Sequence, residues 1–369
     1  MVMRMRTGFP FLVALMPWFV CVGCSSVADR PATRVAAIPK AGAIQVSEHG
    51  RAVLEKASAA LLAGDNDRAI ELAAPLAAAE PRDAAAQLIL GRALEAQVKR
   101  EYAAGRVPDI DLAERCEFHL GAAVRLLDKD VDARLALGEY YELEGHLEAA
   151  LASYESILRF AALDKRALVA AARVATELGE ERNAARHFEA LRAKPPVPTE
   201  VLLEEARCYM TLAASNDSGD RTRWLRLARR AFRDLGERQP KDARAPAGEG
   251  YCEFLLASES STIDDTAKSR IRELYLEAAR LAPEDPLPRY NLALFLESSL
   301  VGDPGAARDE YRATLARDAS HVPSLLNLAR LLWIAGEKDA ARVYWRRVLP
   351  LLGDEDEKRR VRAMLSREP

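Results

Sequence analysis

The sequence has few of the residues on which catalytic, metal and disulfide sites depend. Its 369 residues include five cysteines, with no Cys-x-x-Cys pair, and five histidines that are scattered along the chain. The motifs of zinc proteases, serine hydrolases and nucleotide-binding loops do not occur in it. So few cysteines do not make a disulfide scaffold, and their spacing does not fit a zinc ribbon. We therefore expect no metal, no cofactor, no catalytic residue and no enzymatic activity.

An excess of charge of one sign is also lacking. The chain carries 53 Lys and Arg against 56 Asp and Glu, for a formal net charge of −3, and no basic stripe stands out. Nucleic acid binding needs a concentrated basic surface that displaces counterions from phosphates. We therefore expect no nucleic acid partner. Hydrophobic residues make up 49% of the chain, which is ample for a packed core.

A long apolar run is missing too, and the N-terminus has only a short one. An apolar stretch from Phe9 to Val22 follows Arg4 and Arg6, and two prolines interrupt it. It is shorter than the roughly 18 residues that a membrane-spanning helix needs. A basic start, a short apolar segment and small residues at its end are typical of a secretory signal peptide. Residues 1–23 are therefore interpreted as a signal that takes the protein out of the cytoplasm.

The end of this stretch, Cys-Val-Gly-Cys at 21–24, resembles the lipobox of bacterial lipoproteins. The resemblance implies that Cys24 is lipidated, becomes the mature N-terminus and anchors the protein in a membrane. Ser25 is similar to the residue that directs lipoproteins to the outer membrane, where the chain would face the periplasm. Cys21 stands where the family usually has Leu, and cleavage after Ala28 would instead release a secreted or periplasmic protein.

Small, glycine and aromatic residues recur at a spacing of 34. The residues of one segment, followed by their counterparts 34 positions later, are Gly138, Tyr141, Gly145, Ala150, Tyr154 and Ile157, then Ala172, Ala175, Gly179, Ala184, Phe188 and Leu191. Two antiparallel helices approach closely only where side chains are small, so each segment predicts a pair of helices with glycine at the turn. The position of the small residue in the second helix recurs along the chain and predicts about eight units. It is occupied by Ala69, Cys116, Ala150, Ala184, Ala228, Ile271, Ala307 and Ala341.

This pattern resembles the tetratricopeptide repeat. The resemblance implies an all-α fold, a right-handed superhelical solenoid of antiparallel helix pairs over residues 49–353. Residues 24–48 have no periodic apolar pattern and are interpreted as the lipidated cysteine and a flexible tether. Residues 354–369 begin with acids and continue with bases, as the helix dipole favours, and are expected to form a capping helix and tail.

Four of the intervals between units are longer than this regular spacing, and the surplus falls between the first and the second helix of the unit. The extra residues lie around 97–111, 213–220, 257–265 and 298–301. In a stacked solenoid these turns lie along one edge, and such edges often bind partners. The alternative is that the surplus forms tolerated loops or lengthened helices.

The remaining titratable residues are interpreted as structural. Cys116, Cys208 and Cys252 fall at helical positions that want small buried residues, and a bond between the last two would need unusually close packing. The five histidines, and acidic pairs such as Glu204-Glu205, are expected on the solvated surface.

In the tetratricopeptide family the first helix of each pair lines the inner face of the superhelix. By that resemblance nine residues on these helices are expected to bind a protein or peptide. They are Arg173, Arg207, Tyr251, Phe254, Tyr290, Asn291, Asn327, Arg330 and Trp333, and Glu139 and Met210 lie beside them. Arginine and aromatic side chains together are the usual composition of protein-binding hot spots. Phe254 and Trp333 have an alternative role in the core between repeats. The ligand is expected either in this groove or on the inserted edge.

The resemblance favours a lipid-anchored envelope protein that serves as scaffold or assembly factor for a larger machine, such as a pilus, a secretion system or outer-membrane assembly. Two alternatives stay open. One is a non-catalytic accessory of polysaccharide or peptidoglycan synthesis, and the other is an enzyme whose site is built across repeats. Acids and bases that converge in the groove would indicate the enzyme.

Overall fold

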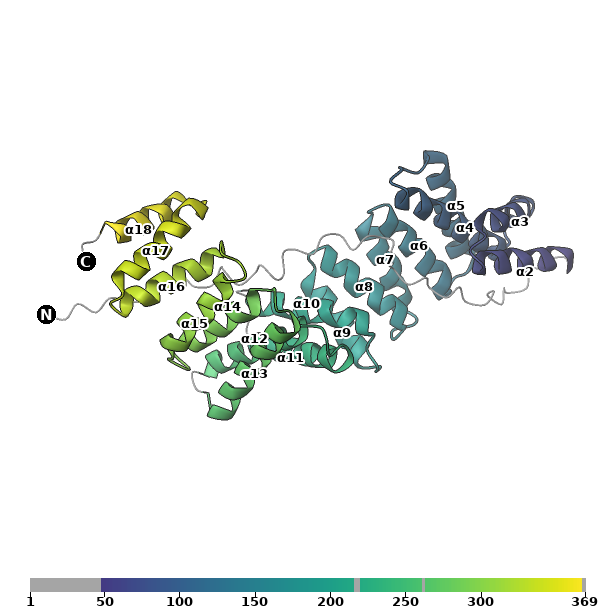
Figure 1. The fold of residues 1–369 in the computed structure, drawn as a ribbon. Coiled ribbons are helices and arrows are strands. Elements are labelled where there is room, and N and C mark those ends of the chain that lie inside the picture. Colours follow the sequence, from purple (N-terminus) through teal and green to yellow (C-terminus); the bar gives the residue numbers. More distant parts are fainter. Residues whose placement is uncertain (1–47, 216–219, 261–262, 367–369) are drawn as a thin grey trace. The chain divides into compact units, whose positions relative to one another are not determined.

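The computed structural model describes residues 48–215, 220–260 and 263–366. This part of the chain contains seventeen α-helices and no strand (Figure 1), and none of these helices is both long and apolar enough to cross a membrane. Sixteen helices form eight successive pairs, and one more helix follows the last pair. The pairs are α2 (Glu48–Leu62) with α3 (Asn66–Ala79), α4 (Ala84–Ala103) with α5 (Ile110–Leu126), α6 (Val131–Leu143) with α7 (Leu147–Leu158), α8 (Lys165–Glu177) with α9 (Glu181–Arg192), α10 (Leu202–Ala214) with α11 (Arg221–Arg238), α12 (Arg244–Ser260) with α13 (Asp265–Leu281), α14 (Leu287–Glu297) with α15 (Pro304–Leu315), and α16 (Val322–Ile334) with α17 (Lys338–Val348).

These helices fall into two compact units. The N-terminal unit ends at Val197 and holds the first four pairs, and the C-terminal unit begins at Pro198 and holds the other four. The last helix, α18 (Glu355–Leu365), belongs to the C-terminal unit, in which Val361 is buried in the core and Met364 packs against it. The expected eight helix pairs and the expected C-terminal helix are therefore present.

Aspartate starts many of these helices. The carboxylate of Asp83 accepts hydrogen bonds from the amides of Ala85 and Ala86, and Asp164 does the same for Arg166 and Ala167. Such caps satisfy amides that have no partner inside the helix. The side chains of Asp130, Asp264, Asp303 and Asp354 cap their helices in the same manner.

Glycine ends the first helix of several pairs. Gly145 has a φ of 76° and Gly179 a φ of 72°, in the left-handed region that other residues rarely adopt. Each lies in the short turn to the second helix of its pair, α7 or α9. The glycine that recurs from one repeat to the next is therefore required by the backbone of this turn, as the sequence predicts.

The two helices of a pair touch where the first has a glycine and the second a large side chain. A Cβ atom on Gly138 of α6 would lie 2.4 Å from Cε1 of Tyr154 on α7, which is closer than real Cβ contacts come. The Tyr154 side chain is fully buried at this contact. In the pair α4 and α5, a Cβ on Gly91 would lie 2.6 Å from Cδ2 of Leu120. The predicted close approach of paired helices is therefore confirmed in two pairs.

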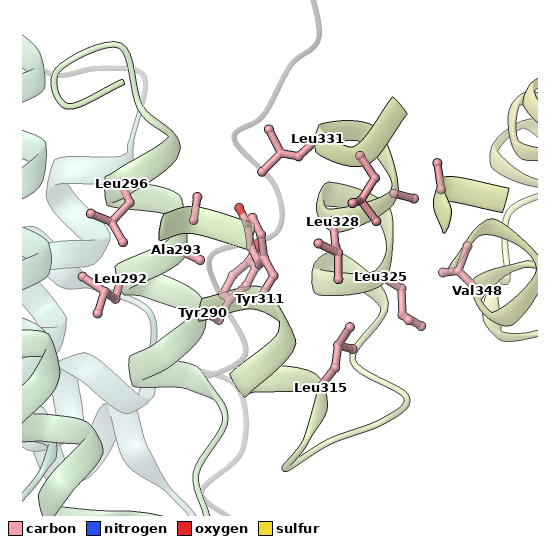
Figure 2. Packing of buried hydrophobic residues seen from close by; sticks show 14 of the residues in the cluster. Tyr290, Leu292, Ala293, Leu296, Tyr311, Leu315, Leu325, Leu328, Leu331 and Val348 are labelled. Atoms are coloured by element: carbon pink, nitrogen blue, oxygen red, sulfur yellow. The ribbon is translucent and has the colours of Figure 1, made fainter. Parts of the chain in front are cut away.

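Each unit has a core of its own. In the N-terminal unit the core joins apolar residues from α2 through α6. In the C-terminal unit a second core runs from α13 to α18, and Figure 2 shows Tyr290 of α14 and Tyr311 of α15 lying together in it, with Leu325 and Leu328 of α16 nearby. Apolar burial of this kind, shared between neighbouring pairs, is what holds a stack of repeats together.

The three cysteines of the described chain are buried thiols that form no disulfide. Cys116 lies in the N-terminal core, and Cys208 and Cys252 lie on α10 and α12. The Sγ of Cys252 is 3.4 Å from the Sδ of Met210 and is not bonded to Cys208. The interpretation of these thiols as small buried residues is confirmed.

Most of the surplus residues lengthen helices. α4 has 20 residues and α11 has 18, whereas α6 to α9 have 12 or 13 each. α5, α12 and α13 have 17 residues each. In the insertion around 97–111, the loop at 104–109 is also longer than the other turns. Lengthened helices therefore account for most of the surplus, and the binding of a partner at this edge stays a prediction.

Two surface expectations are wrong. Glu205 is fully buried, since it lies on the side of α10 that also buries Leu202, Ala206 and Tyr209. His187 of α9 is also buried, with 9% of its surface exposed, and Nε2 lies 3.4 Å from Oε1 of Glu155. Residue type alone indicated a solvated side chain, but the helical register decides burial at both places.

We predict that Gly138→Ala lowers the stability of the protein. The added methyl group overlaps the Tyr154 ring, at a cost of about 1–3 kcal/mol, which exceeds the roughly 1 kcal/mol that alanine contributes over glycine in a helix. The measurement is the urea midpoint of the loss of helical circular dichroism.

Gly121→Ala on α5 is the matched control for this prediction. A Cβ at Gly121 would meet only the end of the flexible Arg125 side chain, at 3.2 Å. This variant should keep or raise the midpoint. A midpoint for Gly138→Ala as high as that of the control would contradict the close-approach account.

Candidate functional site

All nine residues predicted for the groove lie on first helices of the pairs. Arg173 is on α8 of the N-terminal unit. The C-terminal unit holds Arg207 on α10, Tyr251 and Phe254 on α12, Tyr290 and Asn291 on α14, and Asn327, Arg330 and Trp333 on α16. The sequence therefore placed the candidates on the intended set of helices. Their contacts divide them into three groups.

In the N-terminal unit, ion pairs join consecutive first helices. Nη1 of Arg92 on α4 lies 2.6 Å from Oε2 of Glu139 on α6. Nη1 of Arg166 on α8 lies 2.6 Å from Oδ1 of Asp132, also on α6. Each pair has one partner in each of two neighbouring repeats, so these charges brace the repeats against one another.

Arg173 takes part in a buried version of the same contact. Its Nη2 donates to both oxygens of Glu142 on α6, at 2.7 and 2.6 Å, and the Glu142 side chain is only 1% exposed. The hydroxyl of Tyr154 donates to Oε1 of Glu142 at 2.5 Å. This Glu–Tyr–Arg triad joins both helices of one repeat to the first helix of the next. Arg173 is therefore committed to the carboxylate of Glu142.

The C-terminal unit contains a second triad of the same kind. The hydroxyl of Tyr311 on α15 donates to Oε2 of Glu297 at 2.9 Å, and Arg330 on α16 pairs with Oε1 of the same carboxylate. Nδ2 of Asn327 donates to the Tyr311 hydroxyl at 3.2 Å. Two predicted groove residues, Asn327 and Arg330, are thus bound to their own chain.

The second repeat lacks the complete triad. Glu95 on α4 is buried at the place equivalent to Glu142, but Leu120 stands in the tyrosine position and Glu139 in the arginine position. Nη1 of Arg92 lies 3.6 Å from Oε2 of Glu95 and pairs more closely with Glu139. Burial, with the nearby charge of Glu139, raises the pKa of Glu95 despite the opposing charge of Arg92. The direction of the shift indicates that a carboxylate buried at this position needs a hydroxyl and a guanidinium beside it to keep its charge.

Three predicted aromatic residues pack into the C-terminal core. Tyr290 is 4% exposed among the core residues (Figure 2). Phe254 packs edge-on against Phe295 at a centroid distance of 5.4 Å, and the Trp333 ring lies 5.2 Å from that of Trp345. The alternative interpretation, a core residue between repeats, fits Phe254, whose partner Phe295 lies in the next pair. Trp333 packs instead within its own pair, against α17.

Arg207, Tyr251 and Asn291 differ from the other six. Within the described residues, none of the three makes a hydrogen bond or an ion pair with another side chain. We call them the C-terminal polar row, since they lie on the successive first helices α10, α12 and α14. Arg207 and Tyr251 hold equivalent positions, each directly before a buried cysteine. Each is partly buried, so its polar group stands at the edge of the core.

The polar row combines positive and neutral polar groups. Burial lowers the pKa of Arg207, and the positive charge of Arg244 lowers it further, while the negative charge of Glu204 opposes both effects. Arg244 itself is held by Asp242, with Nη2 2.6 Å from Oδ2. Burial raises the pKa of Tyr251 to about 12, so its hydroxyl keeps its proton at neutral pH. The row therefore offers a guanidinium, a hydroxyl donor and a carboxamide.

The described residues offer little for catalysis. Among them there is no group of His, Cys, Asp and Glu side chains that would hold a metal ion. Burial raises the pKa of the Cys116 and Cys252 thiols, which makes both of them poor nucleophiles. The chemistry that this arrangement supports is the binding of polar and charged groups.

The sequence prediction of the groove missed the two carboxylates of the triads, Glu142 and Glu297. Glu142 precedes Tyr154 in its own repeat and Arg173 in the next, and Glu297, Tyr311 and Arg330 follow in the same order. A glutamate at the end of one first helix, followed by tyrosine in the second helix and arginine in the next repeat, is the signal that would have revealed them.

Comparison with known proteins identifies the repeats. A family model described as "Tetratricopeptide repeat" matches residues 54–114 and 301–353, so tetratricopeptide repeats are present in both units. A search of curated proteins finds no match. The matched ranges cover the end of α2 through the start of α5, and α15 with the pair that follows it.

Solved structures share the fold at low sequence identity. The C-terminal part of a TPR repeat-containing protein from Cytophaga hutchinsonii has a TM-score of 0.51 and 12% identity, over 74% of this chain and 99% of that one. A tetratricopeptide repeat protein from Parabacteroides merdae gives 0.41 and 19%, over 74% and 97%. YrrB, a TPR protein with an unusual peptide-binding site, gives 0.45 and 17%, over 56% and 95%. The first of these confirms the expected all-α fold of tetratricopeptide-like helix pairs.

Proposed function

We propose that this protein is a lipid-anchored scaffold of the bacterial envelope that binds other proteins through its first helices. The observation that carries the proposal is the C-terminal polar row, Arg207, Tyr251 and Asn291, because within the described residues these polar groups make no hydrogen bond or ion pair with another side chain. Elsewhere on the first helices, Arg173 is held by the buried carboxylate of Glu142 and Arg330 by the partly buried carboxylate of Glu297.

The residues of the row suit an extended segment of another protein. An arginine and a tyrosine are the residue types that most often dominate protein interfaces. The guanidinium of Arg207 would pair with a carboxylate, since Arg244 beside it already has Asp242 as its partner. The carboxamide of Asn291 would both donate to and accept from a peptide backbone. The proposed ligand is therefore a polypeptide segment that places an acidic group near Arg207.

The braced repeats supply the rigid support that such a site needs. A binding group held by packing loses less conformational entropy when its ligand arrives. In the C-terminal unit, α14 carries Asn291 and also Glu297, whose carboxylate is held by Tyr311 and Arg330. Asn291 is thereby fixed to a helix that cannot shift without breaking this triad. A scaffold or assembly factor of a pilus, secretion or outer-membrane machine would use such a preorganised surface.

The location of the protein follows from its N-terminal pattern. Cys24 and the tether lie outside the described residues. The basic start, the short apolar segment and the Cys-Val-Gly-Cys run support lipidation at Cys24, and Ser25 supports the outer membrane. The folded units would then lie in the periplasm on a tether.

We predict that Cys24→Ser abolishes metabolic labelling of the protein with palmitate, because the thiol that takes the lipid is gone. Cys21→Leu is the matched control, since it removes a nearby thiol and installs the residue usual in the lipobox, and it should keep the label. The measurement is the radioactivity or fluorescence of the immunoprecipitated protein. Unchanged labelling of Cys24→Ser would exclude lipidation at this residue.

For the polar row, we predict that a photocrosslinker at Leu287, one turn before Asn291 on α14, captures the partner in cells. Arg207→Glu and Tyr251→Ala should each reduce the crosslinked product by about tenfold, because each removes a central contact. The product is measured by immunoblot and identified by mass spectrometry.

Arg226→Glu is the control for this experiment, since it makes the same charge change at an exposed position of α11. Its crosslinked product should equal that of the unaltered protein, and all variants should keep their helical circular dichroism. Equal capture by Arg207→Glu and the control would show that the partner does not bind at the row.

A further inference from the structure

The helix α5 exposes large apolar side chains to solvent. Phe118 is 61% exposed and Ile110 is 74% exposed, and Val107 in the preceding loop is 87% exposed. Phe118 and Ile110 are eight residues apart, so they lie on one face of the helix about 12 Å from each other. Single exposed apolar residues are ordinary, but a row of them on one face marks an interaction site.

A pocket lies beside Phe118 on the same face. It has a volume of about 310 Å³ and is open to solvent. Its walls come from α5 and from Tyr141 of α6, which is the first helix of the next repeat. The lining residues are Glu114, Glu117, Phe118, Gly121, Arg125 and Tyr141. We call Ile110 together with these residues the α5 face.

Gly121 keeps this pocket open. Glycine within a helix is less favourable than alanine by roughly 1 kcal/mol, so a packing or functional reason is expected for it. At Gly91 and Gly138 the reason is a close neighbour, whereas a Cβ on Gly121 would meet only the guanidinium of Arg125, at 3.2 Å. Packing within the chain therefore does not require glycine at this position. A side chain there would instead occupy the pocket.

The α5 face carries two carboxylates, of Glu114 and Glu117, against one guanidinium, of Arg125, so its net charge is negative. Glu114 and Glu117 line the pocket, and the hydroxyl of Tyr141 donates to Oε1 of Glu117 at 3.0 Å. The N-terminal unit as a whole has 26 Asp and Glu against 20 Lys and Arg over residues 48–197. The local and the overall charge both attract a basic partner and repel an acidic one.

We propose that the α5 face binds a basic amphipathic helical segment of another protein. An apolar side chain of that segment fills the pocket against Phe118 and over Gly121, a second contacts Ile110, and its lysines or arginines meet Glu114 and Glu117. Two anchors about two helical turns apart match the spacing of Ile110 and Phe118. This surface belongs to a second helix of the N-terminal unit, so it is a different site from the polar row.

A pair of synthetic peptides tests the proposal on the full chain. One is an amphipathic helix with Phe and Leu on one face and Lys on the other, and its counterpart has Glu in place of every Lys. We expect the lysine peptide to bind about tenfold more tightly by fluorescence anisotropy at low salt, because only its charge complements the face. Phe118→Ser and Gly121→Leu should each weaken its binding about tenfold. The Glu114→Lys, Glu117→Lys double variant should reverse the preference.

Val343→Ser, which removes an exposed apolar side chain from α17, is the matched control and should leave binding unchanged. Helical circular dichroism checks that each variant folds. Failure of the lysine peptide to bind, or equal binding by the unaltered protein, Phe118→Ser and Gly121→Leu, would overturn the proposal. Self-association of the protein in sedimentation experiments would also overturn the proposal if Phe118→Ser abolished it, because a second copy of the chain would then occupy the α5 face.

Discussion

The close approach of paired helices is the constraint on which the rest of the structure depends. Between α6 and α7 it places a residue without a side chain, Gly138, opposite the large ring of Tyr154. The ring fills the space that glycine leaves, and its hydroxyl is carried into the interior. A buried hydroxyl needs an acceptor, and Glu142 provides it at 2.5 Å. The buried carboxylate in turn needs a cation, which Arg173 supplies from the next repeat.

This chain of requirements explains why arginine on a first helix has two roles. Where a glutamate and a tyrosine precede it, as for Arg173 and Arg330, the guanidinium completes an internal triad and joins successive repeats. Where they are absent, as at Arg207, the guanidinium has no such carboxylate, and we propose that it binds a ligand. Glu95 is the opposite case, a buried carboxylate without the full set of partners, and burial raises its pKa. On this proposal, ligand binding depends on which repeats lack the triad.

Much of the fold could be predicted from the sequence because the repeat constrains the backbone directly. Gly145 and Gly179 mark turns that only glycine adopts easily, and Cys116 occupies a fully buried position at which most repeats have alanine. Side-chain partners were harder to predict, since they depend on contacts between repeats. Glu205 was expected in solvent because of its charge, but the register of α10 buries it. The pocket beside Phe118 was also missed, since it depends on how α5 meets α6.

The sequence could name the candidate residues of the groove. It could not separate the side chains that are available to a ligand from those that are bound to their own chain. Arg173 and Arg207 hold equivalent positions in successive repeats, and only the structure shows that one of them has a buried carboxylate as partner. The most direct test of this division is a double-mutant cycle on Glu142→Gln and Arg173→Met, measured as free energies of unfolding. A coupling of about 1–3 kcal/mol is expected for a pair that braces two repeats. A coupling near zero would contradict the account, because Arg173 would then be as available to a ligand as Arg207.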